Sequence, residues 1–291
     1  MLVGPALSGT YRILAFDSGI GGLGIVRAIR ALAPGLVVDY LADTAVFPYG
    51  EQDDAFLISH IVTLLRNAVD RLKPQAVIIA CNTASTLALD ALRSACPATP
   101  FIGCVPPIRW AARVSQTGVI GLLATRATTR RPYLARLLAL HAPDCTLITH
   151  AAPKLAGYAE RLFRGEDVAN PLLEDEIRGL WDHPQSSRLD TVGLGCTHYT
   201  FVLDRLKALA PPGIDWLDPA QAVARHACTV LRAVPALQAP ASPGGAHGLR
   251  PGRAWFTALP ENAGALIAHL PPFGFEQIHL WPDDQFSRLA E

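Results

Sequence analysis

Short apolar runs rich in β-branched residues alternate along the chain with longer stretches whose apolar residues recur at helical spacing. The runs predict strands over 12–16, 37–42, 76–81, 101–105, 119–124, 146–150, 191–195 and 214–217. The longer stretches predict helices over 23–32, 55–72, 85–95, 132–140, 171–181 and 200–209. Nearly continuous apolar strands that alternate with helices are typical of parallel sheets covered by helices on both faces. The pattern therefore predicts an α/β protein.

Two segments interrupt this alternation. Pro106 and Pro107 follow the fourth expected strand, and a proline pair indicates a break in regular structure. The segment 238–253 is rich in Pro, Gly, Ala and Ser, which predicts a mobile surface loop. After it, 254–257 and 277–280 are expected to be short strands on either side of one more helix.

Composition narrows the range of partners. Hydrophobic residues make up 50% of the chain, and Lys+Arg and Asp+Glu are balanced at 25 each. A balanced charge gives no electrostatic reason to expect nucleic acid or an anionic membrane, so small molecules or copies of the chain are the expected partners. No apolar run approaches the roughly 18 residues of a membrane span. Residues 1–10 lack the features of a signal peptide, so a cytoplasmic protein is expected.

Two of the six cysteines stand out by their position. Cys81 and Cys196 each end an expected strand and precede an expected helix, whereas Cys104 is followed by the proline pair. Ligands of parallel α/β sheets bind at the carboxyl ends of the strands. A thiol at a helix N-terminus is expected to have a lowered pKa. The other cysteines are expected to be small buried hydrophobic residues, and the absence of C-x-x-C disfavours a zinc or thioredoxin-like site.

Polar residues follow both cysteines. Asn82 and Thr83 come after the first, Thr197 and His198 after the second, and all four are suited to bind an ammonium or a carboxylate. For Ser85 and Thr200, which come next along the chain, helix capping is the favoured interpretation.

A glycine-rich turn, FDSGIGGLG over 16–24, follows the first expected strand. Its glycine spacing is a poor match to a dinucleotide fingerprint. The turn fits better as a cradle for a small carboxylate, with Asp17 and Ser18 in the pocket. Glu160 is a single acid for which a solvated helix face is the default. The chain contains no G-x-S-x-G, P-loop or H-E-x-x-H motif, and nothing in it indicates a metal or an organic cofactor.

Four segments in order resemble the signature segments of the bacterial glutamate racemases, in the aspartate/glutamate racemase family. They are FDSGIGGL (16–23), DTAVFPYG (43–50), ACNTAS (80–85) and LGCTHY (194–199). The segment GVIGLLATRATTRRPY also resembles the family's glycine- and threonine-rich strand and turn. Four such segments in the family's order make the resemblance specific, and they extend over most of the first 200 residues.

The resemblance implies two pseudo-symmetric α/β lobes with the active site in the cleft between them. The first lobe would comprise 11–105 and 218–291, and the second 106–217. The resemblance also implies interconversion of L- and D-glutamate for peptidoglycan, without pyridoxal phosphate or metal, and it leaves a homodimer open. Cys81 and Cys196 would be the acid/base residues on opposite faces of the substrate. Asp17 would lie near Cys81 and His198 near Cys196, each assisting its thiol in catalysis. The residues implied to hold the substrate are Asp17, Ser18, Tyr49, Gly50, Asn82, Thr83, Thr197 and His198.

The chain departs from the family's pattern at several positions. Gly24 stands where Ser or Thr is usual, and Thr200 where Pro is usual. The second-lobe segment that ends in a catalytic-site Glu is represented only by HAAPKLAGYAE (150–160), which makes Glu160 the candidate helper acid. Three alternatives stay open: a relative acting on aspartate, a hydantoin or an arylmalonate; an amino-acid binding protein without turnover; and a thiol-redox protein.

Overall fold

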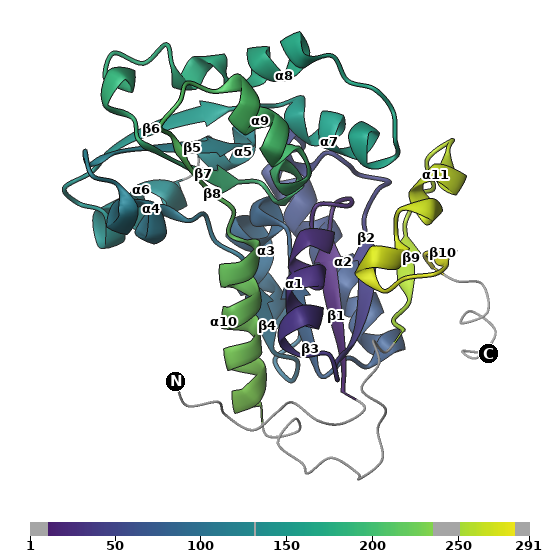
Figure 1. The fold of residues 1–291 in the computed structure, drawn as a ribbon. Helices are drawn as coiled ribbons and strands as arrows, with labels where there is room; N and C mark the ends of the chain where they lie inside the picture. The colour runs from purple at the N-terminus through teal and green to yellow at the C-terminus, as the bar shows by residue number, and fades with distance from the viewer. Residues whose placement is uncertain (1–10, 131, 235–250, 283–291) are drawn as a thin grey trace.

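The computed structural model describes residues 11–130, 132–234 and 251–282, which form two parallel sheets (Figure 1). The first sheet has the order β10-β9-β2-β1-β3-β4. Its strands are β1 (Arg12–Asp17), β2 (Val37–Ala42), β3 (Ala76–Ile79), β4 (Phe101–Gly103), β9 (Ala254–Phe256) and β10 (Ile278–Leu280). The second sheet has the order β6-β5-β7-β8. Its strands are β5 (Val119–Ala124), β6 (Thr146–Ala151), β7 (Thr191–Gly195) and β8 (Asp215–Leu217). We call each sheet with its helices a lobe.

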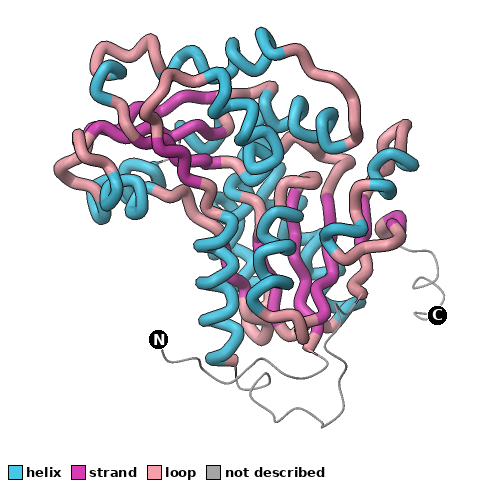
Figure 2. Tube along the Cα trace, viewed as in Figure 1, coloured by secondary structure: helices cyan, strands magenta, loops and turns pink. Residues whose placement is uncertain are grey.

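Helices cover both faces of the first sheet (Figure 2). On one face lie α1 (Leu23–Leu32) and α10 (Ala220–Ala233), and on the other α2 (Asp54–Leu72) and α3 (Asn82–Ala95). Side chains alternate along β1, so that Ile13 and Ala15 pack towards α1 and α10 while Leu14 and Phe16 pack towards α2 and α3. This burial on both sides explains why the strands are continuous apolar runs.

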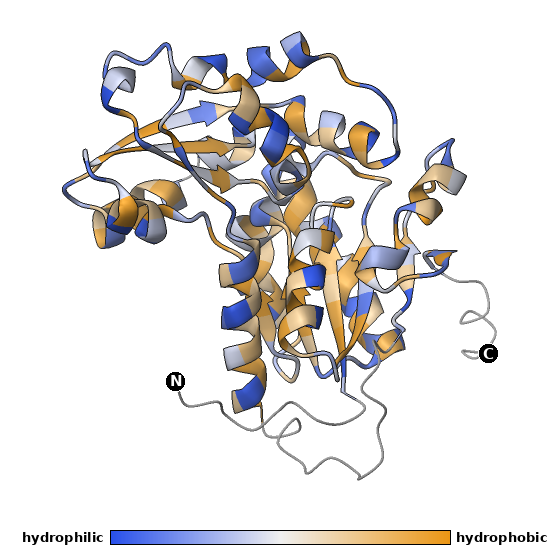
Figure 3. Ribbon diagram, viewed as in Figure 1, coloured by the Kyte–Doolittle hydropathy of each residue, from blue (hydrophilic) through white to orange (hydrophobic). Residues whose placement is uncertain are grey.

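The second sheet is covered in the same manner. One face carries α4 (Ile108–Val114) and α6 (Pro132–His141), and the other α7 (Leu155–Phe163), α8 (Asn170–Ile177) and α9 (Leu203–Leu209). Shorter elements connect these layers: α5 (Arg126–Thr129), α11 (Ala263–Ala268), and the 3-10 turns η1 (Tyr49–Glu51), η2 (Arg178–Leu180), η3 (Ser186–Arg188), η4 (Thr197–Val202) and η6 (Pro271–Phe273). Apolar residues are concentrated in the sheets and on the inward helix faces (Figure 3).

The two lobes share a strand order. In each, the first strand in the chain lies between the second and the third, and the fourth follows the third: β2-β1-β3-β4 and β6-β5-β7-β8. Cys81 follows β3 and Cys196 follows β7, so each cysteine stands after the third strand of its lobe. This repetition confirms the predicted α/β class with two similar lobes. The exact lobe boundaries at 105/106 and 217/218 stay a prediction.

The structure also contains helices that the sequence pattern did not predict, namely α4, α5, α7 and α10. The expected break at Pro106 and Pro107 is present, since 104–107 belong to no helix or strand, and α4 follows it directly. Proline is well tolerated at the start of a helix, and Pro107 is the residue before α4. The predicted helix from residue 200 is wrong in detail, since the 3-10 turn η4 comes first and α9 begins only at Leu203.

Some predictions fall partly outside the described residues. Residues 1–10 lie outside the described residues, and so does the expected loop 238–253 apart from its last three residues, 251–253. Among the helices that the structure describes, none is both long and apolar enough to cross a membrane.

Candidate active site

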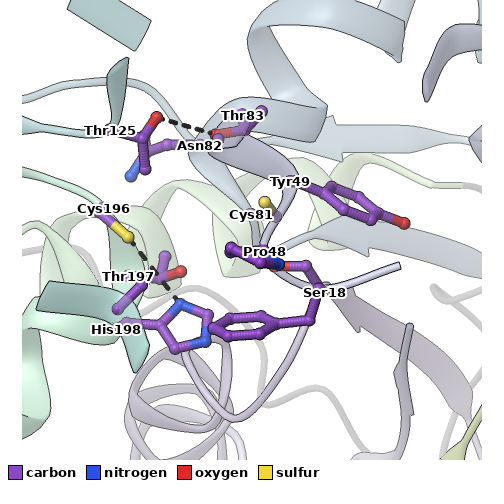
Figure 4. A pocket seen from close by; sticks show the side chains of 13 residues that line it. Ser18, Pro48, Tyr49, Cys81, Asn82, Thr83, Thr125, Cys196, Thr197 and His198 are labelled. Atoms are coloured by element: carbon purple, nitrogen blue, oxygen red, sulfur yellow. Dashed lines mark hydrogen bonds between the residues drawn. The ribbon is translucent and has the colours of Figure 1, made fainter. Parts of the chain in front are cut away.

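A small cavity lies between the lobes, and its lining comes from both of them (Figure 4). Its volume is about 20 Å³, enough for about one water molecule. Cys81 and Cys196 line it and are only 5% and 7% exposed. Figure 4 shows their side chains directed towards the same space from the two sides. The full lining is Ser18, Phe47, Pro48, Tyr49, Gly50, Cys81, Asn82, Thr83, Thr125, Ala156, Cys196, Thr197 and His198.

Cys81 is the residue that caps the N-terminus of α3. It has an extended backbone, and its Sγ accepts a hydrogen bond from the Ala84 N–H at 3.5 Å. The expected lowered pKa is wrong for this thiol. Burial raises the pKa of Cys81 well above its ordinary value, and the Asp17 charge raises it further, while the Ala84 N–H lowers it only in part. The loss of solvation of a buried thiolate raises the pKa more than the N–H groups at the helix N-terminus lower it.

Cys196 begins a relay of polar side chains in the second lobe. Its Sγ lies 3.8 Å from His198 Nδ1, and His198 Nε2 lies 3.1 Å from Glu160 Oε1. Burial by itself lowers the pKa of His198. The hydrogen bonds to Cys196 and Glu160 and the charge of Asp17 outweigh burial, so the His198 pKa is raised well above its ordinary value. The thiol on one side and the carboxylate on the other therefore favour the protonated form of the imidazole.

Asp17 ends β1 and is fully buried. One carboxylate oxygen accepts hydrogen bonds from the Ser18 hydroxyl and the Gly19 N–H, both at 3.2 Å, and the other accepts from the Thr197 hydroxyl at 2.8 Å. Burial raises the pKa of Asp17 above its ordinary value, although His198 and these donors oppose the shift. Asp17 thus joins the first lobe to the Cys196 segment, and its charge also acts on Cys81.

The glycine-rich turn after β1 binds a carboxylate of the protein itself, that of Glu160. The Ile20 N–H donates to Glu160 Oε1 at 2.7 Å. A Cβ atom on Gly19 would lie 2.1 Å from Glu160 Oε1, and one on Gly21 would lie 2.5 Å from His198 Nδ1. In the structure, the Ile20 N–H of the turn is taken by Glu160, whereas Ser18 of the same turn lines the cavity. A role of the turn in holding a substrate carboxylate stays a prediction. The default of a solvated face for Glu160 is wrong, since it is 8% exposed.

Asn82 is the main unsatisfied polar group of the cavity wall. Neither its Oδ1 nor its Nδ2 has a hydrogen-bond partner among the described residues, although both atoms are buried. A buried amide without partners is costly, which makes it a ready binding group for a polar ligand. Thr83 Oγ1 lies 3.3 Å from Thr125 Oγ1, across the two lobes.

Tyr49 and Gly50 enter the wall from η1. The Tyr49 hydroxyl donates to Asp43 Oδ2 at 2.5 Å, and His60 Nε2 lies 2.6 Å from the same oxygen. A Cβ atom on Gly50 would lie 2.7 Å from Thr125 Cβ. The absence of a side chain at position 50 therefore lets this segment approach the second lobe.

The structure adds lining residues that the sequence reasoning missed: Phe47, Pro48, Thr125 and Ala156. A signal for Thr125 existed, because it follows an apolar strand and caps a helix, with the Thr128 N–H donating to its Oγ1 at 3.3 Å. Phe47 and Pro48 lie in the signature segment 43–50, directly before Tyr49, but their place in the cavity wall was not predicted. Ala156 carries no such signal.

The predicted helix caps at Ser85 and Thr200 are wrong. Helix α3 begins at Asn82, and the Ser85 hydroxyl instead donates to the Ile79 carbonyl and accepts from the Cys104 N–H. The Thr200 hydroxyl donates to Asp218. Burial raises the pKa of Cys104 to about 12, so this third strand-end thiol is protonated at neutral pH.

Comparison with known proteins gives consistent results. The sequence profile of the Asp/Glu/hydantoin racemases matches residues 24–227. The chain is 52% identical over 230 residues to the glutamate racemase of Granulibacter bethesdensis, which covers 79% of this chain and 82% of the relative. It is 41% identical to that of Brucella anthropi, over 78% and 82% of the two chains. Among solved structures, the Escherichia coli glutamate racemase in complex with L-glutamate and the activator UDP-MurNAc-Ala has a TM-score of 0.81, at 33% identity over 92% of this chain and 97% of that one.

Proposed function

Since this chain belongs to the aspartate/glutamate/hydantoin racemase family and is an amino-acid racemase, we propose that it interconverts L- and D-glutamate without a cofactor. The observation that carries the choice of substrate is the 52% identity to a glutamate racemase over most of both chains. The similarity to a structure that contains L-glutamate supports the same substrate. Cys81 and Cys196, which line one buried cavity from different lobes, are the proposed acid and base.

The proposed reaction is a proton transfer through the cavity. One thiolate takes the α-hydrogen as a proton, and the electron pair left on Cα is delocalised into the α-carboxylate. The other thiol then gives its proton to the opposite face of Cα. The first cysteine ends protonated and the second ionised, so the enzyme is left ready for the reverse reaction. The product enantiomer is fixed by which cysteine starts as thiolate.

The raised pKa of Cys81 fits this requirement for one thiol and one thiolate. Two buried thiolates in one small cavity are electrostatically unfavourable, so a single ionised cysteine is the preferred active form. In the second lobe, His198 is placed to donate a hydrogen bond to the Cys196 thiolate, and Glu160 stabilises the imidazolium. Asp17 is proposed to act on both sides, through its charge near Cys81 and its hydrogen bond to Thr197.

The substrate is held by the polar lining. Asn82, with its unpartnered amide, and the hydroxyls of Ser18, Thr83 and Thr197 are proposed to bind its carboxylates and ammonium. The proposal extends to Tyr49 and Gly50, whose segment shapes the wall opposite Thr125, and to His198.

The proposed role is the supply of D-glutamate for peptidoglycan. This role implies a cytoplasmic enzyme, and all six cysteines are free in the structure, as is usual in a reducing compartment. The division into lobes of 11–105 with 218–291 and 106–217 is part of the same proposal, and a homodimer stays a prediction.

The test is racemisation of L-glutamate by the purified protein in D₂O, with no added cofactor and after chelation of metals. We expect D-glutamate that carries deuterium at Cα, because each proton delivered from a thiol exchanges with solvent. A panel of aspartate, a hydantoin and an arylmalonate, assayed in parallel, identifies any other family substrate. Binding of glutamate without deuterium incorporation would refute the proposed activity and favour an amino-acid binding protein.

A further inference from the structure

The carboxylate of Glu160 divides its partners between its two oxygens. Oε1 faces the catalytic side, where it accepts from the Ile20 N–H at 2.7 Å and lies 3.1 Å from His198 Nε2. Oε2 faces the other way and lies 3.4 Å from Nη1 of Arg164, one helical turn along the chain. Glu160 is therefore held from both sides, and only its inner oxygen reaches the relay to Cys196.

Arg164 is itself fixed in place. It stands at the C-terminal end of α7, and its side chain is 17% exposed. Its Nε donates to Glu166 Oε1 at 2.9 Å while Nη1 points to Glu160, so one guanidinium bridges two carboxylates. A planar guanidinium holds such a bridge in a fixed geometry that an ammonium does not reproduce.

A second cavity places Arg164 at the edge of the cleft. This cavity, about 310 Å³, is lined by Arg164 and Glu160 together with Phe47, which also lines the small cavity with the two thiols. The guanidinium thus stands between solvent and the buried relay.

We propose that Arg164 is a positioning residue for the proton transfers of Cys196, and that it acts by orienting Glu160. The inference rests on the proposed racemase function and adds to it a residue outside the cavity that holds the thiols. The terminal torsion of a glutamate side chain has broad, roughly two-fold preferences. Fixing Oε2 on Arg164 therefore keeps Oε1 directed at His198. When that tie is lost, the Ile20 N–H alone holds the carboxylate, so Oε1 is less firmly directed at His198 and His198 is less firmly held against Cys196.

The test uses Arg164→Met, which keeps the apolar stem but removes the guanidinium, and Arg164→Lys, which keeps the charge. Arg161→Met is the matched control, because Arg161 lies on the same helix and binds Glu166 at 3.1 Å but makes no bridge to Glu160. We expect Arg164→Met to lower kcat roughly 10-fold to 100-fold with a smaller change in KM. Arg164→Lys should recover only part of the loss, and Arg161→Met should retain wild-type kinetics.

The readout that separates positioning from general damage is the primary isotope effect with substrates deuterated at Cα. Only one enantiomer gives its α-hydrogen to Cys196. In Arg164→Met we expect the isotope effect to rise for that enantiomer and not for the other. An equal change for both enantiomers, or none for either, would overturn the proposal.

A double-mutant cycle with Glu160→Gln tests the route of the effect. If Arg164 acts through Glu160, adding Arg164→Met to Glu160→Gln lowers kcat little further. Fully additive losses would contradict the proposal even where Arg164→Met alone is slow because it folds poorly. Absence of glutamate racemisation in the wild-type protein would instead refute the proposed function, so the two failures are distinguishable.

Discussion

At the scale of single residues, the two thiols that meet in the small cavity make the sharpest prediction. Replacement of Cys81 or Cys196 by Ser should lower racemisation in both directions by about 100-fold to about 10,000-fold, because a hydroxyl is a far weaker acid than a thiol. Circular dichroism of the substrate solution measures the rate. Cys145→Ser is the control, since Cys145 is a partly exposed thiol of the second lobe outside the cavity. Full activity in either active-site variant would exclude the two-cysteine mechanism.

The raised pKa of Cys81 predicts how the rate depends on pH. Burial favours the thiol form of Cys81, so a second thiolate at Cys81 forms only at a pH well above the ordinary pKa of a thiol. We therefore expect kcat/KM to hold or increase with pH and to fall only once Cys81 is ionised in the free enzyme. A profile from about pH 6 to about pH 10 measures both limbs. A rate that declines steadily from pH 6 would contradict this assignment.

Asp17 predicts a conflict between activity and stability. Burial raises its pKa in the folded state, so its ionisation disfavours folding, and stability falls as the pH rises from the unfolded towards the folded pKa. Asp17→Asn removes this penalty. The variant should have a higher Tm than wild type at neutral pH, with a difference that shrinks towards low pH, and much lower racemase activity. Thermal melts across the acidic range test the sign, and a lower Tm at neutral pH would show that the Asp17 carboxylate stabilises the fold.

Sequence reasoning at this scale succeeded where a residue carries its own chemistry. Cys81, Asn82 and His198 were identified from their types and their place after strands, and the structure brings them into one site. The pKa of Cys81 was not predictable, because it depends on how deeply the folded chain buries the thiol and on the charge of Asp17. The contact between Glu160 and Ile20 joins residues 140 positions apart and has no local signature.

At the scale of elements, the turn after β1 requires glycine, because a side chain at Gly19 would collide with the second lobe. Gly19→Ala would place a Cβ 2.1 Å from Glu160 Oε1 and 2.8 Å from His198 Nε2. We expect a loss of about 1–3 kcal/mol in stability together with a large loss of activity, because the relay must move. Urea unfolding and the racemase assay measure the two effects.

Gly157→Ala is the matched control for that prediction. Gly157 lies in α7, and a Cβ there would meet nothing within 4 Å. The exchange should stabilise the protein by about 0.5–1 kcal/mol through helix propensity and leave the rate unchanged. If Gly19→Ala behaves like Gly157→Ala, the turn does not need its glycine for this contact.

Elements with a strong local pattern were predictable, and others were not. The central strands were predicted within a residue or two, because burial on both faces gives them unbroken apolar runs. Helix α10 was not predicted, although Val223, Ala227 and Leu231 follow helical spacing on its buried face. Alanines also occur on its other faces, so the buried face does not stand out in the apolar pattern. The 3-10 turn η4 replaces the first turn of a predicted helix, where β-branched and aromatic residues disfavour the α-helix.

At the scale of the whole molecule, the thiol cavity is small for the proposed substrate. A space of about 20 Å³ holds about one water molecule and is far too small for glutamate. For the proposed reaction, we therefore expect the substrate to enter through a more open arrangement of the cleft, which closes around it and excludes water from the proton transfers.

This closure predicts the reactivity of the thiols. Iodoacetamide should alkylate Cys81 and Cys196 more slowly than the partly exposed Cys96 and Cys145, and more slowly still in the presence of D-glutamate. Mass spectrometry of each cysteine peptide over time measures the rates. Alkylation of the two buried thiols as fast as that of Cys96 would show that the cleft is open most of the time.

The shared strand order of the two lobes places one thiol after the third strand of each. Mirror-image molecules have the same free energy in water, so at equilibrium the L and D forms are equal in amount. For the proposed reaction, thermodynamics then requires kcat/KM to be the same in both directions. A substitution in either lobe must therefore lower kcat/KM by the same factor in both directions. It can change separately only the KM of each enantiomer, with kcat changing in proportion. A repeated fold can therefore diverge in the sequence of its halves without acquiring a preferred direction.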